Sequence, residues 1–188
     1  SLCAQRPSAA GPPSCRERLR RASIVGIKTM SNQTMSRDLS GTVILITGAG
    51  GSIGRATCAV LSAAGARVVA TDLSSAPADA KVDLWSQLDV TSPTHWRDLV
   101  EDIRQRFGRL DCLINSAGIC PLERIEKTSL ELWRKVMSVN VESMLLGMQA
   151  ALPLLRESGK DRVGGASIVN LASTAGLRGV QNAAAYCA

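Results

Sequence analysis

The loop ThrGlyAlaGlyGlySerIleGly at residues 47–54 constrains the fold of this 188-residue chain more than any other stretch. A short apolar run at 42–47 leads into it, and apolar residues at helical spacing follow it. Glycine is needed where a Cβ atom would block a tight turn, or would keep backbone N–H groups from a pyrophosphate at a helix N-terminus. Gly48, Gly51 and Gly54 meet that need, so the loop predicts a phosphate-binding connection between a strand and a helix. An ordinary tight turn is the alternative, because the literal G-x-G-x-x-G pattern is not matched.

Strand-like and helix-like segments alternate along the rest of the chain. Short apolar or β-branched runs predict strands at 67–72, 85–89, 110–115 and 166–171, and helical periodicity predicts helices at 53–64, 93–107 and about 129–156. Pro at the first turn and Gly108 after the last turn support the helix at 93–107. The alternation predicts right-handed βαβ units, and hence an α/β fold with a doubly wound parallel sheet of the Rossmann type.

The net charge of +6 is concentrated near the start of the chain. Residues 1–38 contain seven basic and two acidic residues, which leaves 15 basic and 14 acidic residues from position 39 onward. The later part is nearly neutral, so a nucleic-acid partner is not expected. The first segment is rich in Ser, Pro and Gly, and GlyProPro at 11–13 would break regular structure. We therefore predict a disordered basic extension over 1–38 and one folded domain over 39–188.

The apolar runs are far shorter than the ~18 to 20 residues that a membrane-spanning helix needs, so a membrane partner is not expected. Because the chain begins with Ser, we expect that its start is incomplete, and Met30 and Met35 are the candidate starting residues. Arg-rich, Ser-bearing and acid-poor leaders are also typical of organellar transit peptides. We expect a cytoplasmic protein, or a mitochondrial one if residues 1–38 are such a leader.

Six cysteines are present, but no CxxC motif occurs and no hydrophobic signal segment opens the chain. Reduced thiols are therefore expected, and no metal site is expected. The six are Cys3, Cys15, Cys58, Cys112, Cys120 and Cys187.

A carboxylate ends the second predicted strand. Asp72 lies 18 residues after Gly54, where it can accept both hydroxyls of an adenosine ribose and repel a 2′-phosphate. The next two residues, Leu73 and Ser74, are not basic. This pattern favours NAD as the cofactor over NADP, and a solvated acid at a strand end is the alternative.

From about residue 39 to its end, the chain resembles the short-chain dehydrogenase/reductase family. Thr47, Gly48 and Gly54 match the family's glycine loop, TGxxxGxG, and Ser52 stands in place of its middle glycine. The resemblance implies a dinucleotide-binding oxidoreductase domain over 39–188.

Two further motifs carry the resemblance. Asp89 and Val90 match the family's pair that contacts adenine, and residues 115–118 match its NNAG stretch with Ser116 in place of the second Asn. The cofactor-binding residues that these motifs and the loop imply are Thr47, Gly48, Gly51, Ser52, Ile53, Gly54, Asp72, Leu73, Asp89, Val90, Asn115, Ala117 and Gly118.

Reduction of a ketone needs a proton at oxygen while a hydride reaches carbon, and a phenol can deliver that proton. Tyr186 is the only tyrosine of the chain. By the resemblance it is the acid-base group, Ser173 holds the substrate oxygen, and Asn140 completes a proton relay. The implied function is an NAD-dependent interconversion of a secondary alcohol and a ketone. Taken singly, a loop serine, a helix-face asparagine and a packed tyrosine are the alternatives.

The family carries a lysine four positions after this tyrosine, which would be residue 190, whereas the sequence ends at Ala188. From the resemblance we expect a sheet that is incomplete on its C-terminal side and a 188-residue fragment that is inactive. The full-length parent would act on a small-molecule alcohol or ketone as a homodimer or homotetramer. The sequence does not specify which substrate.

Two rival functions are carried forward. The loop and Asp72 would also suit a non-catalytic nucleotide-binding protein. Residues 50–54 fit the G-x-S-x-G elbow of a serine hydrolase with Ser52 as nucleophile, but His95 is the only histidine and lies at a predicted helix start.

Overall fold

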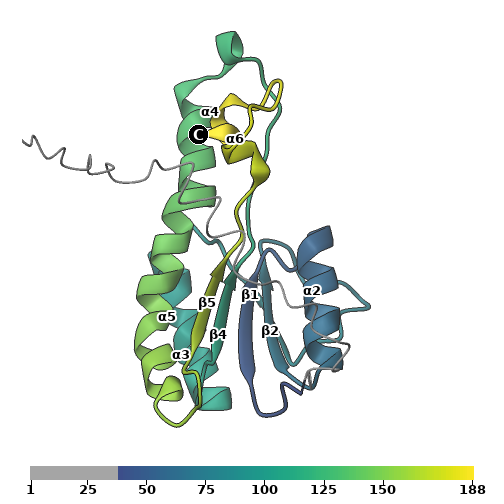
Figure 1. The fold of residues 1–188 in the computed structure, drawn as a ribbon, viewed down its shortest axis with the longest axis vertical. Helices are drawn as coiled ribbons and strands as arrows, with labels where there is room; N and C mark the ends of the chain where they lie inside the picture. Colours follow the sequence, from purple (N-terminus) through teal and green to yellow (C-terminus); the bar gives the residue numbers. More distant parts are fainter. Residues whose placement is uncertain (1–37) are drawn as a thin grey trace, which may run out of the picture. The chain divides into compact units, whose positions relative to one another are not determined.

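Five parallel strands form one sheet in the order β3-β2-β1-β4-β5, as the computed structural model of the chain shows (Figure 1). The structure describes residues 38–188, so the extension predicted over 1–38 lies outside the described residues except for Asp38. The predicted α/β fold with a parallel Rossmann-type sheet is confirmed. The strands are β1 (Val43–Thr47), β2 (Arg67–Asp72), β3 (Leu84–Gln87), β4 (Cys112–Asn115) and β5 (Ser167–Asn170).

The central strand β1 is buried on both faces because helices cover the sheet from two sides. Val43 and Leu45 point toward the core formed with α3 (Pro93–Phe107) and α5 (Ser143–Gly159). The alternate residues Ile44 and Ile46 belong to a second core beside α2 (Ser52–Ala63). The chain runs from β1 outward to β3 and then returns to β4, so the loops at the carboxyl end of β1 flank a switch point where ligands bind in such sheets.

Helix α3 has the ends that its sequence predicted. The Ser92 hydroxyl accepts a hydrogen bond from the His95 N–H, and Pro93 occupies the first turn. Gly108 ends the helix with a left-handed φ of 69°. Trp96 of this helix is buried and donates its indole N–H to the Val90 carbonyl at 2.9 Å.

The helix predicted at about 129–156 is not one regular helix. It begins as α4 (Leu130–Met137), passes through a π-helical turn, η2 (Ser138–Glu142), and continues as α5. A π turn inserts one residue into the α-helical register, which changes the direction of the side chains it carries. Asn140 lies in this turn.

Three short elements complete the described residues: η1 (Ile125–Lys127), η3 (Thr174–Gly176) and α6 (Ala184–Cys187). Helix α6 packs beside α4, beyond the carboxyl end of the sheet (Figure 1). It begins two residues before Tyr186.

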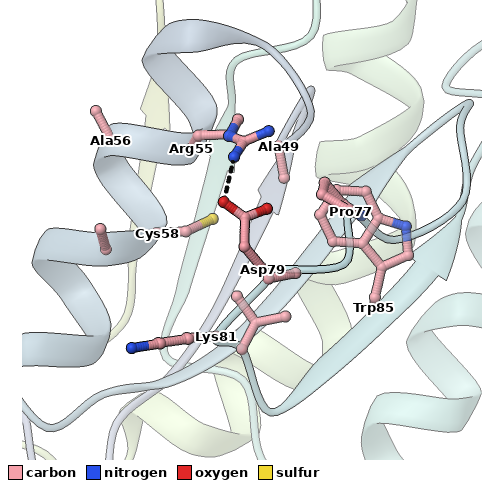
Figure 2. A pocket seen from close by; sticks show the side chains of 11 residues that line it. Ala49, Arg55, Ala56, Cys58, Pro77, Asp79, Lys81 and Trp85 are labelled. Carbon is pink, nitrogen blue, oxygen red and sulfur yellow. Dashed lines mark hydrogen bonds and ion pairs between the residues drawn. The ribbon is translucent and has the colours of Figure 1, made fainter.

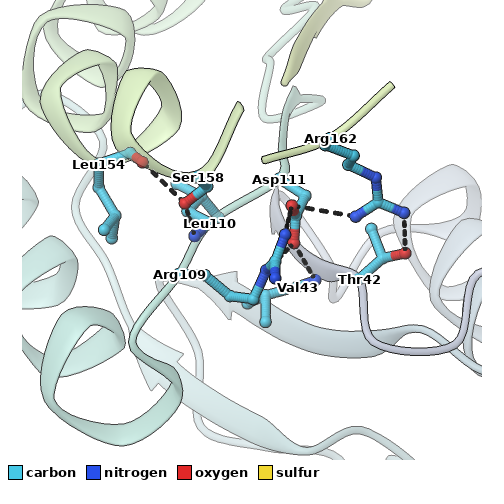
Figure 3. A network of polar contacts seen from close by, with 8 residues as sticks. All are labelled: Thr42, Val43, Arg109, Leu110, Asp111, Leu154, Ser158 and Arg162. Atoms are coloured by element: carbon cyan, nitrogen blue, oxygen red, sulfur yellow. Dashed lines mark hydrogen bonds and ion pairs between the residues drawn. The ribbon is translucent and has the colours of Figure 1, made fainter. Parts of the chain in front are cut away.

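At the amino end of the sheet, Asp111 is buried and gathers several donors (Figure 3). Its carboxylate accepts the Val43 N–H at 2.9 Å, a two-pronged contact from Arg109 at 2.9 and 2.6 Å, and a contact from Arg162 at 3.0 Å. Burial by itself raises the pKa of Asp111, but the hydrogen bonds from Arg109, from the Val43 N–H and from Arg162 hold the pKa below its usual range. Arg162 also donates to the Thr42 hydroxyl at 2.9 Å, so the network joins β1, β4 and the α5–β5 connection.

Within residues 38–188, no helix combines the length and apolar character that crossing a membrane would require. The four cysteines in this range, Cys58, Cys112, Cys120 and Cys187, are free thiols. The expectation for Cys3 and Cys15 lies outside the described residues.

Candidate active site

The glycine loop packs so closely that two of its glycines admit no side chain. Gly48 has a φ of +68°, and a Cβ atom there would lie 2.8 Å from the Ala117 Cα. A Cβ atom at Gly54 would collide with the Gly48 carbonyl and would lie 2.7 Å from the Ala49 Cα. At Gly51 the nearest atom would be 3.4 Å away, an ordinary contact. Gly48 and Gly54 are therefore required by the fold, whereas a side chain at Gly51 would extend into open space beside the N-terminus of α2.

The buried side chain of Thr47 connects this loop to the segment after β4. Its hydroxyl oxygen accepts the backbone N–H groups of Ser116 and Ala117, both at 3.0 Å. The side chain is buried, so these two contacts position the segment after β4 against Gly48. The structure thus places Thr47 as a link between two loops.

Asp72 lies at the carboxyl end of β2, next to the glycine loop. Its Oδ2 accepts the Gly50 N–H at 2.9 Å. Its Oδ1 accepts the N–H and the hydroxyl of Ser74 at 3.3 and 3.1 Å. Three donors therefore orient the carboxylate, while Leu73 beside it is exposed. The sequence pattern identified Asp72 but not Gly50 and Ser74 as its partners, because those contacts depend on how the loops turn back toward it.

Asp89 and Val90 follow β3 and differ in exposure. Asp89 accepts the hydroxyl and the N–H of Thr91 at 2.7 and 2.9 Å, and these two bonds lower the pKa of Asp89 against a smaller effect of burial. Val90 is buried in the core beside α3. The Asp89 carboxylate is thus held in one orientation just after the edge strand β3, whereas the neighbouring Val90 packs into the core.

Two asparagines lie beside the segment after β4, and one of them contacts its backbone. Asn115 is buried and donates its amide N–H to the Asn170 Oδ1 at 2.8 Å. Asn140 uses both ends of its side chain on Ile119, accepting its N–H and donating to its carbonyl, each at 2.9 Å. A Cβ atom at Gly118 would lie 3.4 Å from the Asn140 Oδ1. The π turn therefore aims Asn140 at the backbone of this loop.

A cavity of about 490 Å³ brings the predicted catalytic residues together. Ser173, Tyr186 and Asn140 all line it, together with the predicted cofactor residues Ile53, Ala117 and Gly118. Its other walls come from residues that sequence analysis did not identify: Ser116, Ile119, Cys120, Met144, Asn170, Leu171, Ala172, Gly176, Cys187 and Ala188. The other predicted cofactor residues do not line this cavity: Thr47, Gly48, Gly51, Ser52, Gly54, Asp72, Leu73, Asp89, Val90 and Asn115.

The Ser173 hydroxyl is partly engaged. Its oxygen accepts the Ala175 N–H at 3.1 Å and so caps the short η3 turn. A hydroxyl that accepts one bond retains its own proton for donation. Ser173 can therefore present that proton to a ligand oxygen in the cavity that it shares with the half-buried Tyr186.

The arrangement does not assemble a serine hydrolase. His95 is exposed at the start of α3 and its Nδ1 accepts the Asp89 N–H at 3.3 Å. Among the described residues no hydrogen bond joins His95 to Ser52, which lies exposed at the start of α2. The nucleophile-base contact that such an enzyme requires is therefore not formed.

Comparison with known proteins gives a consistent picture. A sequence model described as short chain dehydrogenase matches residues 42–188. The chain is 35% identical over 161 residues to trans-4-hydroxycyclohexanecarboxylate dehydrogenase of Sinomonas cyclohexanicum, covering 78% of this chain and 60% of that protein. It is 34% identical over 164 residues to cyclohexanol dehydrogenase of an Acinetobacter species, covering 82% of this chain and 63% of that protein.

Among solved structures, the ligand-free aldohexose dehydrogenase of Thermoplasma acidophilum superimposes with a TM-score of 0.71 at 30% identity. The match covers 81% of this chain and 56% of that one. The chain thus spans about 60% of the length of the curated relatives named above.

Proposed function

Because the chain belongs to the short-chain dehydrogenase family, we propose that it carries the cofactor-binding and proton-transfer groups of an NAD-dependent oxidoreductase. The reaction would interconvert a secondary alcohol and a ketone. The family uses nicotinamide cofactors in general, and the relatives named above are dehydrogenases of alcohols by their names.

The observation that carries this proposal is the shared cavity of Ser173 and Tyr186 beside the loop 115–119. In the direction of reduction, the Tyr186 phenol would donate its proton to the carbonyl oxygen of the substrate. The Ser173 hydroxyl would donate a hydrogen bond to the same oxygen and so fix it for that transfer. The nicotinamide cofactor, when bound, supplies or accepts the hydride.

The residues of the glycine loop suit a dinucleotide. Gly48 and Gly54 let the loop fold tightly on itself, because a Cβ atom at either position would collide with backbone atoms, and Gly51 directly precedes α2. Backbone N–H groups at such a helix start favour an anion, so this loop would hold the pyrophosphate.

The choice of NAD over NADP is proposed from Asp72. Its carboxylate is oriented by Gly50 and Ser74 before any ligand arrives. An ionised carboxylate there can accept the ribose hydroxyls and would repel a 2′-phosphate. Neither Leu73 nor Ser74 offers a positive charge that would reverse this preference.

Asn140 is proposed as a positioning residue. Each polar end of its side chain makes one hydrogen bond to the Ile119 backbone, and this pair of contacts fixes the side chain beside the cavity. Its contribution would be to hold the loop after β4 beside the cavity.

Two measurements test the proposal. First, NADH titrated into the chain should bind and should bind more tightly than NADPH. Second, in the protein that carries this chain, Tyr186→Phe should lower alcohol oxidation by ~10²- to 10⁴-fold while NADH affinity stays unchanged. Unchanged turnover in Tyr186→Phe would refute the acid-base role. Binding of NADH without any turnover of alcohols or ketones would instead favour a non-catalytic nucleotide-binding protein.

A further inference from the structure

The connection between β2 and β3 contains no helix. Parallel strands are usually joined by a helix that packs on the sheet, but residues 73–83 form only bends and turns. As a consequence, Ala56 and Ala59 of α2 are exposed on the side where such a helix would lie. A cavity of about 320 Å³ occupies this space between α2 and the connection (Figure 2).

Most of the residues that line this cavity are apolar, and one of them is aromatic. Ala56 and Ala59 form the helix side, and Pro77, Val82 and Trp85 form the opposite side. The Trp85 indole N–H donates to the Ser74 carbonyl at 3.1 Å, which fixes the orientation of the ring. A fixed aromatic face surrounded by alkyl groups suits a flat apolar molecule. The volume is at the low end of the range for small-molecule sites, about 300 to 1,000 Å³.

The side chains that line the cavity carry one more positive charge than negative charges. Arg55 and Asp79 pair at 2.7 Å across the space between α2 and the connection, so their charges balance (Figure 2). Lys81 also lines the cavity, and no carboxylate in residues 38–188 pairs with it. Burial raises the pKa of the Cys58 thiol, so this lining group stays neutral and does not repel an anion. A single negative charge on a ligand would complement this arrangement.

The cavity is separate from the candidate active site. It shares no lining residue with the cavity of Ser173 and Tyr186. Its nearest link to the cofactor residues is Ala49, which lies in the glycine loop. A ligand here would therefore not occupy the position proposed for substrate.

We propose that this cavity is a second ligand site, which takes a flat apolar molecule bearing one carboxylate. The ring system would lie against Trp85 and Pro77, and the carboxylate would point toward Lys81, since Arg55 is already paired with Asp79.

The probe for this proposal is 2-naphthoate, a two-ring aromatic carboxylate, with 2-naphthalenemethanol as its neutral counterpart. Titration calorimetry on the chain should show saturable binding of 2-naphthoate, tighter than that of the alcohol, both without NADH and at saturating NADH. Tryptophan fluorescence should fall on binding, and Trp85→Phe should remove that change. Absence of binding at millimolar probe, or displacement of the probe by NADH, would overturn the proposal.

Variants separate this site from non-specific adsorption. Ala59→Phe fills the cavity from the exposed face of α2 and should weaken 2-naphthoate by at least about tenfold. Ala56→Leu is the second filling variant, and circular dichroism shows that each variant is folded. Lys81→Gln should weaken 2-naphthoate about two- to fivefold and leave the alcohol unchanged, whereas the matched change Lys127→Gln on η1 should alter neither. Equal binding of 2-naphthoate to the filling variants and to the original chain would contradict the assignment.

Discussion

At the scale of single residues, the orientation of Asp72 is the feature with the most direct consequence for the cofactor. Gly50 donates to one carboxylate oxygen, and Ser74 donates twice to the other. The negative charge is therefore held in place at no further entropic cost when a ribose arrives. If NADP bound instead, its 2′-phosphate would lie beside this carboxylate, and the two negative charges would repel each other.

Under the proposed preference for NAD, removing the negative charge of Asp72 should weaken the discrimination against NADPH. Asp72→Asn keeps a side chain of the same size but loses the negative charge, so the ratio of NADPH to NADH dissociation constants should fall by about tenfold or more. Fluorescence titration of both cofactors measures it. Asp98→Asn, an exposed change on α3, is the control and should leave the ratio as it was. An unchanged ratio in Asp72→Asn would show that the selectivity arises elsewhere.

The glycine loop allows a paired test of folding against binding. Gly54→Ala forces a collision with the Gly48 carbonyl, so we expect a loss of about 1 to 3 kcal/mol in the free energy of unfolding. Gly51→Ala has room for its methyl group and should stay within about 0.5 kcal/mol, yet it should weaken NADH because the methyl group stands beside the phosphate cradle. Urea unfolding and NADH titration of both variants check this. A stable Gly54→Ala protein would contradict the packing argument.

Residue identity alone predicted which groups would contact a cofactor, but not which contacts these groups make within the protein. Thr47 and Asp72 were expected to contact the cofactor, and the structure places the Thr47 hydroxyl on Ser116 and Ala117. That contact joins segments that lie about 70 residues apart in the sequence. A pattern of neighbouring residues cannot predict this contact, nor the contact between Gly50 and Asp72. The ligand contacts of the cofactor residues stay predictions.

At the scale of elements, the π turn between α4 and α5 is the main departure from the expected helix. Apolar residues recur at helical spacing both before and after the π turn, and one inserted residue hardly changes that pattern. The sequence at about 129–156 therefore predicts a continuous helix. Asn140, which lies in this turn, makes a tertiary contact that no local pattern contains, the double hydrogen bond with Ile119. Helix α3, by contrast, was predictable to its ends because Ser92, Pro93 and Gly108 carry local signals.

The Asn140 contact predicts a coupled loss of stability and activity. Asn140→Ala leaves the partly buried N–H and carbonyl of Ile119 without their partner, so unfolding should become easier by about 1 to 3 kcal/mol. In the protein that carries this chain, the maximal rate should fall while its pH profile keeps its shape, because a positioning residue does not itself titrate. Gln149→Ala, exposed on α5, is the control. A shifted pH profile would indicate a direct part in proton transfer.

At the scale of the whole molecule, the two ends of the sheet have different tasks. The carboxyl ends carry the glycine loop, Asp72 and the cavity with Tyr186, whereas the amino ends are joined by the Asp111 network. The sheet and its flanking helices were predictable because buried parallel strands are continuous apolar runs. The network was not, since Asp111 lies in an otherwise apolar segment and its partner Arg162 is distant in sequence. The oligomeric state and the compartment stay predictions.

The Asp111 network should make the protein sensitive to acid. The pKa of Asp111 is lower in the folded protein than in the unfolded chain, where it is ~3.9. The stability that the ionised carboxylate contributes is therefore fully present above pH ~3.9 and is lost as the pH falls through the lower pKa of the folded protein. Asp111→Asn should cost about 2 kcal/mol in the free energy of unfolding at pH 7, because it leaves Arg109 and Arg162 beside a neutral group. The difference in unfolding free energy between the two proteins should shrink toward pH 3.

Urea unfolding at several pH values measures this difference. Asp102→Asn is the control, because the exposed ion pair of Asp102 with Arg106 should contribute less than about 0.5 kcal/mol. A pH-independent difference would mean that the shape of the side chain matters more than its charge.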